Sequence, residues 1–344
     1  MFGPDLNDDF GRFNALPHCP PLSGWRSVMK ALVTGGAGFI GSHLAETLVR
    51  RGARVVIVDL AAEAQRENLA WIRPGDAVDV VTGDAGDPAL LRQLVPGTDW
   101  ILHHAALPSV PRSIALPAES NAVNLDATLT LLLAAREAKV RRFLFASSSS
   151  IYGESEEPAK HEALPPQPLS PYALQKYAAE RYGQLFHRLY GLPTVSLRYF
   201  NVFGPRQAFD SPYSGVIARF CTAFLKQESP VLFGDGLQSR DFTHIRNVVA
   251  GNLLALEAPE ANVAGRVFNI ACGRSISLLQ LVADLSRLTG RALAPQFQPE
   301  RAGDIRHSLA DISAARDRLG YVPETDWETG LRETLGWYRG QHTP

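Results

Sequence analysis

Short apolar runs alternate with amphipathic segments along the first two hundred residues of the chain. The runs have the length and β-branched content of buried strands, and the longer segments between them have the apolar spacing of helices. Such alternation predicts a parallel sheet with helices on both faces. The expected strands are Lys30–Thr34, Arg54–Val58, Val78–Asp84, Trp100–His103, Arg142–Ala146 and Thr194–Arg198, and the expected helices are Ser42–Arg51, Asn121–Lys139 and Pro171–Tyr190.

The regular alternation stops after Asn201, where turns and shorter elements follow. An apolar strand at Val267–Ile270 is nevertheless expected to return to the main sheet, so that the two parts of the chain interleave. We predict an α/β fold, with a doubly wound parallel sheet in residues 29–200 and a smaller α/β substrate-binding lobe in residues 201–344. Residues 1–28 lack the apolar core of a secretory signal, and we interpret them as a disordered extension or the result of an upstream start codon. Further helices are expected near Val248–Glu257 and Leu278–Leu288.

A glycine-rich turn joins the first predicted strand to the first predicted helix. Its sequence from Thr34 to Gly41, T-G-G-A-G-F-I-G, fits both G-x-x-G-x-x-G and G-x-G-x-x-G. Glycine lets the backbone turn tightly and approach a pyrophosphate, and the following helix presents its N–H groups to the negative charge. The flanking strand and helix favour the dinucleotide cradle of a Rossmann domain over an ordinary turn. The residues expected to contact the dinucleotide are Gly35, Gly38, Phe39, Ile40 and Gly41.

Carboxylates end the next two predicted strands. Asp59 lies eighteen residues beyond Gly41, where a carboxylate accepts hydrogen bonds from the adenosine ribose hydroxyls. No arginine follows Asp59 until Arg66, so nothing adjacent would neutralise a 2′-phosphate, and NAD is favoured over NADP as the cofactor. Asp84 is a candidate acceptor for the adenine amino group, with capping of its own loop as the alternative.

A tyrosine and a lysine lie four residues apart on the helix predicted at Pro171–Tyr190. Tyr172 and Lys176 therefore share one face of that helix. We expect the lysine charge, together with the positive nicotinamide, to lower the pKa of Tyr172 toward working pH, so that the phenol can exchange a proton with a substrate hydroxyl. The serine run 147–150 follows a buried strand at the carboxyl edge of the sheet, where ligands of such folds bind. One of its hydroxyls is expected to polarise the reacting oxygen.

Composition limits the possible partners. The chain has 344 residues and a formal net charge of −1 at pH 7, which argues against nucleic acid or an anionic membrane as the main partner. Its three cysteines, Cys19, Cys221 and Cys272, are widely scattered, which fits a reducing cytoplasm and neither a disulfide framework nor a zinc site. His103 and His104 are expected to point to opposite faces of one strand, so no metal is expected. No apolar run approaches the length of a membrane span.

Several short segments between residue 30 and about residue 340 match one known family. They are T-G-G-A-G-F-I-G from Thr34, H-H-A-A from His103, S-V-P-R-S from Ser109, S-S-S-S-I-Y-G from Ser147, S-P-Y-A-L-Q-K from Ser170, R-Y-F-N-V-F-G-P-R-Q from Arg198, G-D-G-L-Q-S-R-D-F from Gly234 and R-A-G-D-I-R-H-S from Arg301. In these segments the chain resembles the extended short-chain dehydrogenases/reductases. Within them it is similar to the nucleotide-sugar epimerases, close to the UDP-glucose and UDP-N-acetylglucosamine 4-epimerases.

The resemblance implies a role for each matching residue. Ser148 would be the hydroxyl partner of the substrate, Tyr172 the acid and base, and Lys176 the residue that tunes Tyr172 and holds the nicotinamide ribose. Arginine forks suit the oxygens of a diphosphate, and a carboxylate suits vicinal ribose hydroxyls. The remaining implied contacts are Ala105, Asn124 and Phe200 for the cofactor, Asn201, Arg240 and Arg301 for the diphosphate, Asp304 for the uridine ribose, and Gln207, Val216 and Ser308 for the rest of the substrate.

The reaction implied by the resemblance is epimerisation at C4 of a UDP-hexose. Tyr172 would take the proton of the 4-hydroxyl while C4 passes a hydride to NAD, and the hydride would return to the opposite face of the 4-keto sugar. Related dehydratases and decarboxylases carry an acidic residue directly after the serine, whereas Ser149 follows Ser148 here. This favours an epimerase, although Glu154 and Glu156 keep a dehydratase or decarboxylase as an alternative.

Residue 308 bears on the choice of sugar. In similar epimerases this position limits the space around the C2 substituent, and the small Ser308 would leave room for an N-acetyl group. We therefore predict activity on UDP-GlcNAc and UDP-GalNAc, with UDP-Glc and UDP-Gal as poorer substrates. The nearest alternative is a UDP-glucuronate 4-epimerase, with Arg206 or Arg112 as the cation near C6. A non-catalytic NAD-binding sensor is a remote alternative. Pro108 and Asn247 depart from the pattern of the family, which often has glycine and aspartate there.

Apolar stripes on the helices predicted from Asn121 and Pro171 bear on assembly. In the family two such helices form a four-helix contact between subunits, so the resemblance implies a homodimer. The stripes could equally be ordinary core.

Overall fold

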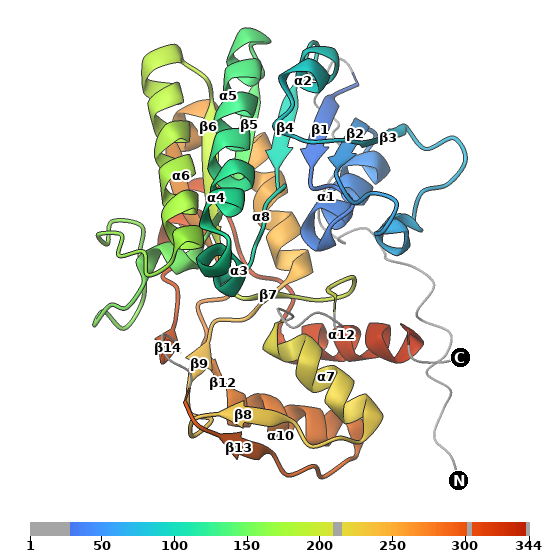
Figure 1. The fold of residues 1–344 in the computed structure, drawn as a ribbon, viewed down its shortest axis with the longest axis vertical. Helices are drawn as coiled ribbons and strands as arrows, with labels where there is room; N and C mark the ends of the chain where they lie inside the picture. The colour runs from blue at the N-terminus through green and yellow to red at the C-terminus, as the bar shows by residue number, and fades with distance from the viewer. Residues whose placement is uncertain (1–27, 209–214, 301–304, 342–344) are drawn as a thin grey trace.

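A seven-stranded parallel sheet forms the main part of the computed structural model, which describes residues 28–208, 215–300 and 305–341 (Figure 1). The strand order is β11-β6-β5-β4-β1-β2-β3, so the direction of the winding reverses between β1 and β4. This confirms the predicted doubly wound sheet, whose ligands bind outside the carboxyl ends of the strands at such a reversal. The strands are β1 (Lys30–Thr34), β2 (Arg54–Asp59), β3 (Val78–Thr82), β4 (Trp100–His103), β5 (Arg142–Ser148), β6 (Thr194–Tyr199) and β11 (Arg266–Ile270).

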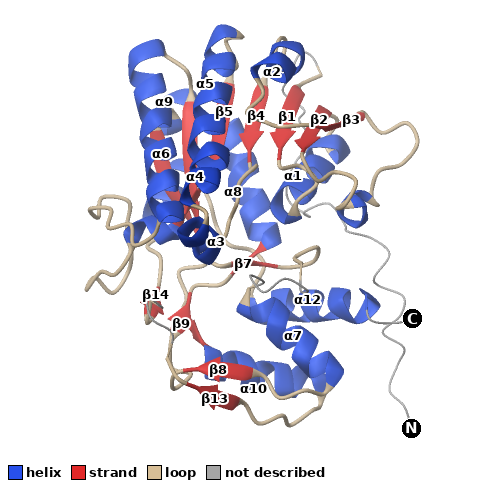
Figure 2. Ribbon diagram, viewed as in Figure 1, coloured by secondary structure: helices blue, strands red, loops and turns tan. Residues whose placement is uncertain are grey.

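Helices cover both faces of the sheet, as Figure 2 shows. One face packs on α1, α8 and α11 through a core that includes Val33, Leu144 and Phe268. The other face packs on α2, α5 and α6 through a core that includes Ile101 and Phe143. Central strands buried on both faces explain the continuous apolar runs of the sequence. The helices are α1 (Phe39–Arg50), α2 (Pro88–Leu94), α5 (Ala127–Glu137), α6 (Pro171–Tyr190), α8 (Ile245–Glu257), α9 (Glu260–Val263) and α11 (Ser313–Leu319).

The helix predicted over Asn121–Lys139 is confirmed from Asn121 to Glu137, with one π-helical turn inside it. The chain forms α3 (Val110–Ala115) and α4 (Pro117–Asn121), then a π-helical turn over Ala122–Asp126, and only then α5. The cause of this π turn lies in the tertiary contacts of Asn124, which are described below, and not in the spacing of the apolar residues. A π turn of this kind widens a helix locally and is often found at functional sites.

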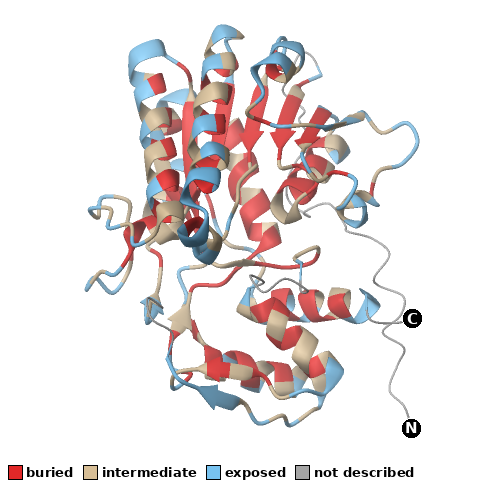
Figure 3. Ribbon diagram, in the orientation of Figure 1, coloured by how far each residue is buried: buried red, intermediate tan, exposed pale blue. Residues whose placement is uncertain are grey.

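A second, smaller core lies beside the carboxyl ends of the sheet strands and forms what we call the C-terminal lobe, below the sheet in Figure 1. The buried residues of this lobe form one cluster, and Figure 3 shows the buried stretches on the lobe helices in red. After visiting the lobe the chain returns to the sheet, where β11 pairs in parallel with β6. The lobe elements are β7 (Val202–Phe203), α7 (Val216–Lys226), β8 (Val231–Phe233), β9 (Ser239–Arg240), β10 (Thr243–His244), β12 (Ile276–Ser277), α10 (Leu278–Thr289), β13 (Gln296–Gln298), β14 (His307–Ser308) and α12 (Trp327–Gln341).

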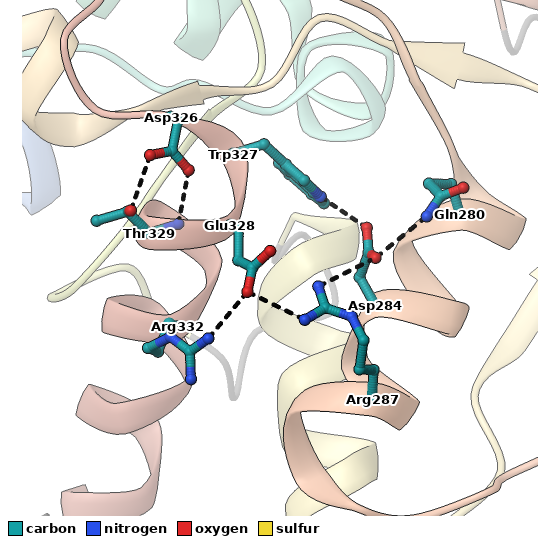
Figure 4. A network of polar contacts seen from close by, with 8 residues as sticks. All are labelled: Gln280, Asp284, Arg287, Asp326, Trp327, Glu328, Thr329 and Arg332. Carbon is teal, nitrogen blue, oxygen red and sulfur yellow. Dashed lines mark hydrogen bonds and ion pairs between the residues drawn. The ribbon is translucent and has the colours of Figure 1, made fainter.

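Polar contacts tie α10 to α12 at the edge of this lobe (Figure 4). The indole N–H of Trp327 donates to Asp284 at 2.8 Å. Glu328 accepts from Arg287 at 3.0 Å and from Arg332 at 2.9 Å. These bonds fix the lobe around its core and leave its β9–β14 side to face the sheet.

Candidate active site

The glycine-rich turn after β1 packs closely against the backbone that follows β4. Gly35 has a positive φ of 66°, and a Cβ on it would lie 2.6 Å from the amide nitrogen of Ala105. A Cβ on Gly41 would collide with the carbonyl oxygen of Gly35. Only glycine fits at these two positions, because the obstructing atoms are backbone and cannot rotate away. The amide of Ala105 also donates to Thr34 Oγ1 at 3.3 Å, which holds the two strand ends together.

The amino end of α1 opens onto this turn. Gly38 precedes the helix, and none of the described side chains caps its first N–H groups. Phe39, Ile40 and Gly41 therefore form a first turn available to an anion. A cradle too narrow for a Cβ, next to an uncapped helix end, has the shape and polarity that a dinucleotide pyrophosphate requires, so the residues present fit NAD.

The two strand-end carboxylates differ in their surroundings. Asp59 accepts from the amide of Ala37 at 3.1 Å and from that of Ala61 at 2.9 Å, so it lies directly against the glycine turn. Asp84 is exposed and accepts from the amide of Gly86 at 2.7 Å. It thus caps its own loop, the role that the sequence left open, while its contact with adenine stays a prediction.

Ser148, Tyr172 and Lys176 come together at the carboxyl edge of the sheet. Ser148 is the last residue of β5, and Tyr172 is in the first turn of α6. The first turn of α6 is held in place because the amide of Tyr172 donates to Ser113 Oγ at 3.1 Å and the Ser170 side chain caps the helix. Ser148 lies beside Tyr172, close enough for its hydroxyl to favour the phenolate form of the tyrosine. The serine that the resemblance selected is thus the one next to the phenol.

Burial governs the protonation of this group of side chains. Desolvation raises the pKa of Tyr172, and the hydroxyl of Ser148 acts in the opposite direction. Lys176 donates from Nζ to the carbonyl oxygen of Ala146 at 2.8 Å and lies 4.8 Å from the centre of the Phe145 ring. Burial lowers the pKa of Lys176 to about 7. In the protein chain alone, burial and Ser148 are what shift the pKa of Tyr172, and the effect of Lys176 together with a bound nicotinamide stays a prediction.

Asn124 links three parts of the site through its amide. Its Nδ2 donates to Ser120 at 3.1 Å, to Gln175 at 2.9 Å and to the carbonyl oxygen of Leu107 at 3.3 Å. Its Oδ1 accepts from the amide of Leu107 at 2.8 Å. Asn124 thereby fixes the loop after β4 against α6, and these contacts account for the π turn around it. Phe200 is fully buried and packs 6.1 Å from the ring of Tyr152.

The predicted substrate residues follow β6 and line the near side of the C-terminal lobe. Asn201 has a positive φ of 35° and donates to the carbonyl oxygen of Asp241 at 3.1 Å. Arg240 and Ser308 are directly paired in the β9–β14 register. Gln207 donates to the carbonyl oxygen of Val202 at 3.1 Å. Its Oε1 is buried without a partner among the described atoms, and Val216 begins α7 nearby. Arg301 and Asp304 lie outside the described residues, as do Tyr213, Ser214 and nearly all of the 1–28 segment.

Asp241 is a residue of this region that the sequence analysis missed. It follows Arg240 directly, is fully buried, and accepts from the amides of Cys272, Gly273 and Ala310 at 2.9 to 3.2 Å. Burial raises its pKa to about 6, against the effect of these hydrogen bonds. Asp241 thus joins three segments of the chain beneath Arg240. The signal that could have identified it in the sequence was its place in the matched G-D-G-L-Q-S-R-D-F segment.

A buried ion pair behind Ser148 was also missed. Glu180 of α6 binds Arg198 of β6 through two bonds of 2.6 and 3.0 Å and accepts from Ser147 Oγ at 2.9 Å. Arg198 lies 4.7 Å from the ring centre of Tyr152, whose hydroxyl donates to Asn269 of β11 at 2.7 Å. This series of contacts holds α6 against β5, β6 and β11, next to the predicted catalytic residues. Isolated in the sequence, Glu180 resembles any other helix carboxylate.

The two cations proposed for a C6 carboxylate are already paired with carboxylates. Arg206 binds Glu46 of α1, and both side chains are largely buried. Arg112 binds Glu119 at 2.5 Å. Asn247, the second departure from the family pattern, bonds both backbone atoms of Thr325, so it acts in packing as expected.

Neither histidine of the H-H-A-A segment belongs to a group of metal-binding side chains among the described residues. His103 contacts Thr34 at 2.7 Å and Thr128 at 2.9 Å, while His104 contacts the hydroxyl of Tyr199 at 3.0 Å. Within residues 28–208, 215–300 and 305–341, no group of three metal-binding side chains is assembled. Over the same ranges, no helix is both long and apolar enough to span a bilayer.

Comparison with known proteins places this geometry in one family. A model of the NAD dependent epimerase/dehydratase family matches residues 31–271. The structure of UDP-N-acetylglucosamine 4-epimerase from Methanobrevibacter ruminantium M1, in complex with UDP-N-acetylmuramic acid, aligns with a TM-score of 0.86 at 40% identity, over 92% of this chain and 99% of that one. UDP-glucuronic acid 4-epimerase from Bacillus cereus, in complex with UDP-glucuronic acid and NAD, aligns with a TM-score of 0.83 at 32% identity, over 91% and 100%.

A curated relative agrees with these structures over the same length. The putative UDP-glucose 4-epimerase of Methanocaldococcus jannaschii is 33% identical over 313 residues, which are 90% of this chain and 99% of that protein. Both the predicted resemblance and the predicted cofactor are thereby confirmed. The chain belongs to the NAD dependent epimerase/dehydratase family, and its cofactor is NAD.

Proposed function

We propose that this protein is a UDP-sugar 4-epimerase that interconverts UDP-GlcNAc and UDP-GalNAc. The observation that carries the proposal is the contact between Ser148 and Tyr172, with Lys176 one turn away, at the carboxyl edge of the sheet beside the glycine cradle. Proton exchange with a sugar hydroxyl requires a titratable group held at this edge. Arg240 across the site offers a guanidinium fork for a diphosphate.

In this proposal each side chain has a separate task. Tyr172 takes the proton of the 4-hydroxyl and later returns it to the same oxygen, when the hydride returns to the opposite face of C4. Ser148 donates its one hydroxyl hydrogen to the reacting oxygen of the sugar. Lys176 orients the ribose end of the cofactor and, once charged there, favours the phenolate. NAD supplies the reversible acceptance of a hydride from C4.

The N-acetyl sugar is preferred in the proposal because of Ser308. This small, half-buried side chain pairs in register with Arg240, so it borders the space next to the proposed diphosphate site. The alternative, a UDP-glucuronate 4-epimerase, would need a cation for the C6 carboxylate, and both Arg206 and Arg112 are engaged by Glu46 and Glu119.

Proton NMR of the purified protein tests the proposal directly. UDP-GlcNAc is added without external NAD, and the anomeric signal of UDP-GalNAc is expected to appear; UDP-glucuronate is assayed alongside. Tyr172→Phe should lower kcat by about 10²- to 10⁴-fold, the range for loss of a general acid–base group, while NAD stays bound. Turnover of UDP-glucuronate alone would refute the sugar choice, and an unimpaired Tyr172→Phe enzyme would refute the mechanism.

We further propose that the protein is a cytoplasmic homodimer. Leu133 of α5 and Leu174, Leu185 and Leu189 of α6 are exposed, between 39% and 63%, and form an apolar surface on these two helices. Leu185→Glu is expected to convert a dimer to a monomer in light scattering, because a charge would be buried in the contact. Val322→Glu, at an exposed position outside α5 and α6, is the matched control. A wild-type monomer would contradict the proposal.

A further inference from the structure

A cavity of about 380 Å³ lies at the amino-terminal edge of the main sheet. Its walls come from the carboxyl ends of α5 and α6 and the start of β5, which Figure 1 shows at the end of the sheet away from the C-terminal lobe. Arg142 begins β5 and lines the cavity, while Ser148 ends the same strand. The two sites are therefore about 20 Å apart along one strand. The cavity is separate from the candidate active site.

Cationic side chains dominate the polar lining of this cavity. Arg136, Lys139, Arg141 and Arg142 face it, against a single lining carboxylate, Glu260. The whole chain has a formal net charge of only −1, so four cations around one hollow are a local concentration of positive charge. Such a concentration attracts anions.

Neighbouring carboxylates offset this charge only in part. Glu137 lies 3.7 Å from Arg136, and Asp99 lies 3.7 Å from Arg141. In each pair one partner is more than half exposed, and solvated pairs at this distance contribute little. Pairing with these carboxylates therefore leaves the lining of the cavity with an excess of positive charge.

Arg142 is the buried member of the group, with an exposure of 6%. Its terminal nitrogens donate to the carbonyl oxygens of Ala255 and Ala258 at 2.7 and 3.1 Å. Its Nε is buried and has no hydrogen-bond partner among the described residues. Arg142 thus contributes a buried positive charge to the lining of the cavity. Burial lowers the pKa of Arg142, and Glu260 only partly opposes this effect.

Lys139 and Tyr190 form the rim. Lys139 follows the end of α5 with a positive φ of 54°, at a position where helices usually place glycine. The chain thus tolerates a strained backbone to present a lysine there. Arg136 stacks on Tyr190, with 5.0 Å between the guanidinium carbon and the ring centre, so its fork is held over the cavity mouth.

We propose that this cavity is a second ligand site, which binds a small soluble anion carrying one or two phosphate groups. The arginine forks would hold the phosphate oxygens in pairs, and Lys139 would add a point charge at the mouth. A half-open hollow bordered by helix ends and a strand suits a small molecule better than the surface of a membrane.

Calorimetry with inorganic pyrophosphate tests the site. The protein is loaded with NAD and saturated with UDP, so that the proposed catalytic site is filled. We expect one pyrophosphate per chain, with an affinity that falls as salt is raised. Arg136→Ala and Lys139→Gly should each weaken binding by about tenfold, the value of one charge-assisted hydrogen bond. Lys139→Gly also relieves the left-handed backbone, so the variant should be at least as stable as the wild type.

The controls separate this site from general attraction to cations. Arg92→Ala removes an exposed arginine on α2 that does not line the cavity, and it should leave binding unchanged. The proposal is overturned if no pyrophosphate binds. It is also overturned if Arg136→Ala and Lys139→Gly bind pyrophosphate as tightly as the control Arg92→Ala. Vesicles containing phosphatidylglycerol provide a further arm: capture by vesicles in the absence of pyrophosphate binding would reject the soluble ligand. If UDP-GlcNAc is not epimerised but the pocket variants still lose pyrophosphate, only the proposed function fails.

Discussion

Among single residues, Ser308 bears most directly on the choice of sugar. It is paired with Arg240 across two short strands, so a larger side chain there would occupy space beside the proposed diphosphate site. We expect Ser308→Tyr to reduce turnover of UDP-GlcNAc by about tenfold or more and that of UDP-Glc much less, because steric exclusion in a pocket discriminates by this order. Initial rates with both sugars provide the measurement. Ser308→Ala serves as the control, and equal losses with both sugars would show that residue 308 does not gate the pocket.

The behaviour of Lys176 shows a limit of sequence reasoning at this scale. The spacing of Tyr172 and Lys176 predicted their shared helix face, and the structure confirms it. Burial sets the direction of the pKa shifts of both side chains in the protein chain alone, and Lys176 also donates to the carbonyl oxygen of Ala146 in β5. A spacing rule carries no information about burial or about such a long-range partner.

At the scale of elements, the β1–α1 turn depends on glycine at Gly41. A Cβ there would collide with the carbonyl oxygen of Gly35 and lie 2.8 Å from the Cα of Gly36, both backbone atoms. Gly41→Ala should therefore open the turn, destabilise the protein by about 1–3 kcal/mol and remove most of the bound NAD. The NAD absorbance of the purified protein and its urea denaturation curve measure the two effects.

A second glycine provides the control for that substitution. A Cβ on Gly340, near the end of α12, would meet nothing within 4 Å, so Gly340→Ala should retain NAD and lose no stability. Full NAD content in Gly41→Ala would mean that the turn adapts, and the cradle assignment would have to be revised.

Elements were predictable where their signals are local. The bounds of α6 matched because Ser170 caps its start and Gly191, in a left-handed conformation, ends it. The helix predicted at Asn121–Lys139 is present from Asn121 to Glu137, but the π turn at Ala122–Asp126 was not predicted; there Asn124 is held by Leu107 and Gln175 from distant parts of the chain. Local apolar spacing gives no sign of such contacts.

For the molecule as a whole, four histidines with lowered pKa values predict a loss of stability in mild acid. Burial holds the pKa of His103, His104 and His244 at about 3, and that of His43 well below its usual value. The unfolded chain takes up protons near pH 6.5 and the folded one does not, so the free energy of unfolding falls as pH drops below 6.5. Over one pH unit each histidine contributes about 1 kcal/mol, or roughly 4 kcal/mol together.

Urea denaturation at pH 6.5 and pH 5.5 measures this effect. The raised pKa of Asp241 has the opposite effect on stability over this range, because the folded protein takes up that proton first. Its effect on the free energy of unfolding is smaller than the contribution of one histidine. His244→Phe should remove about a quarter of the decrease, and His307→Asn, at an exposed site in β14, should leave it intact. Equal stability at the two pH values would contradict the argument.

The late return of β11 to the sheet has a consequence for synthesis on the ribosome. β6 ends at Tyr199, but the strand that covers its free side begins only at Arg266. At about 5–20 residues per second, the buried edge of β6 stays unpaired for several seconds of translation. During that interval the nascent chain presents an apolar strand edge of the kind that templates aggregation. The protein is therefore expected to depend on chaperones while it is being made, although β11 covers that side of β6 in the finished sheet.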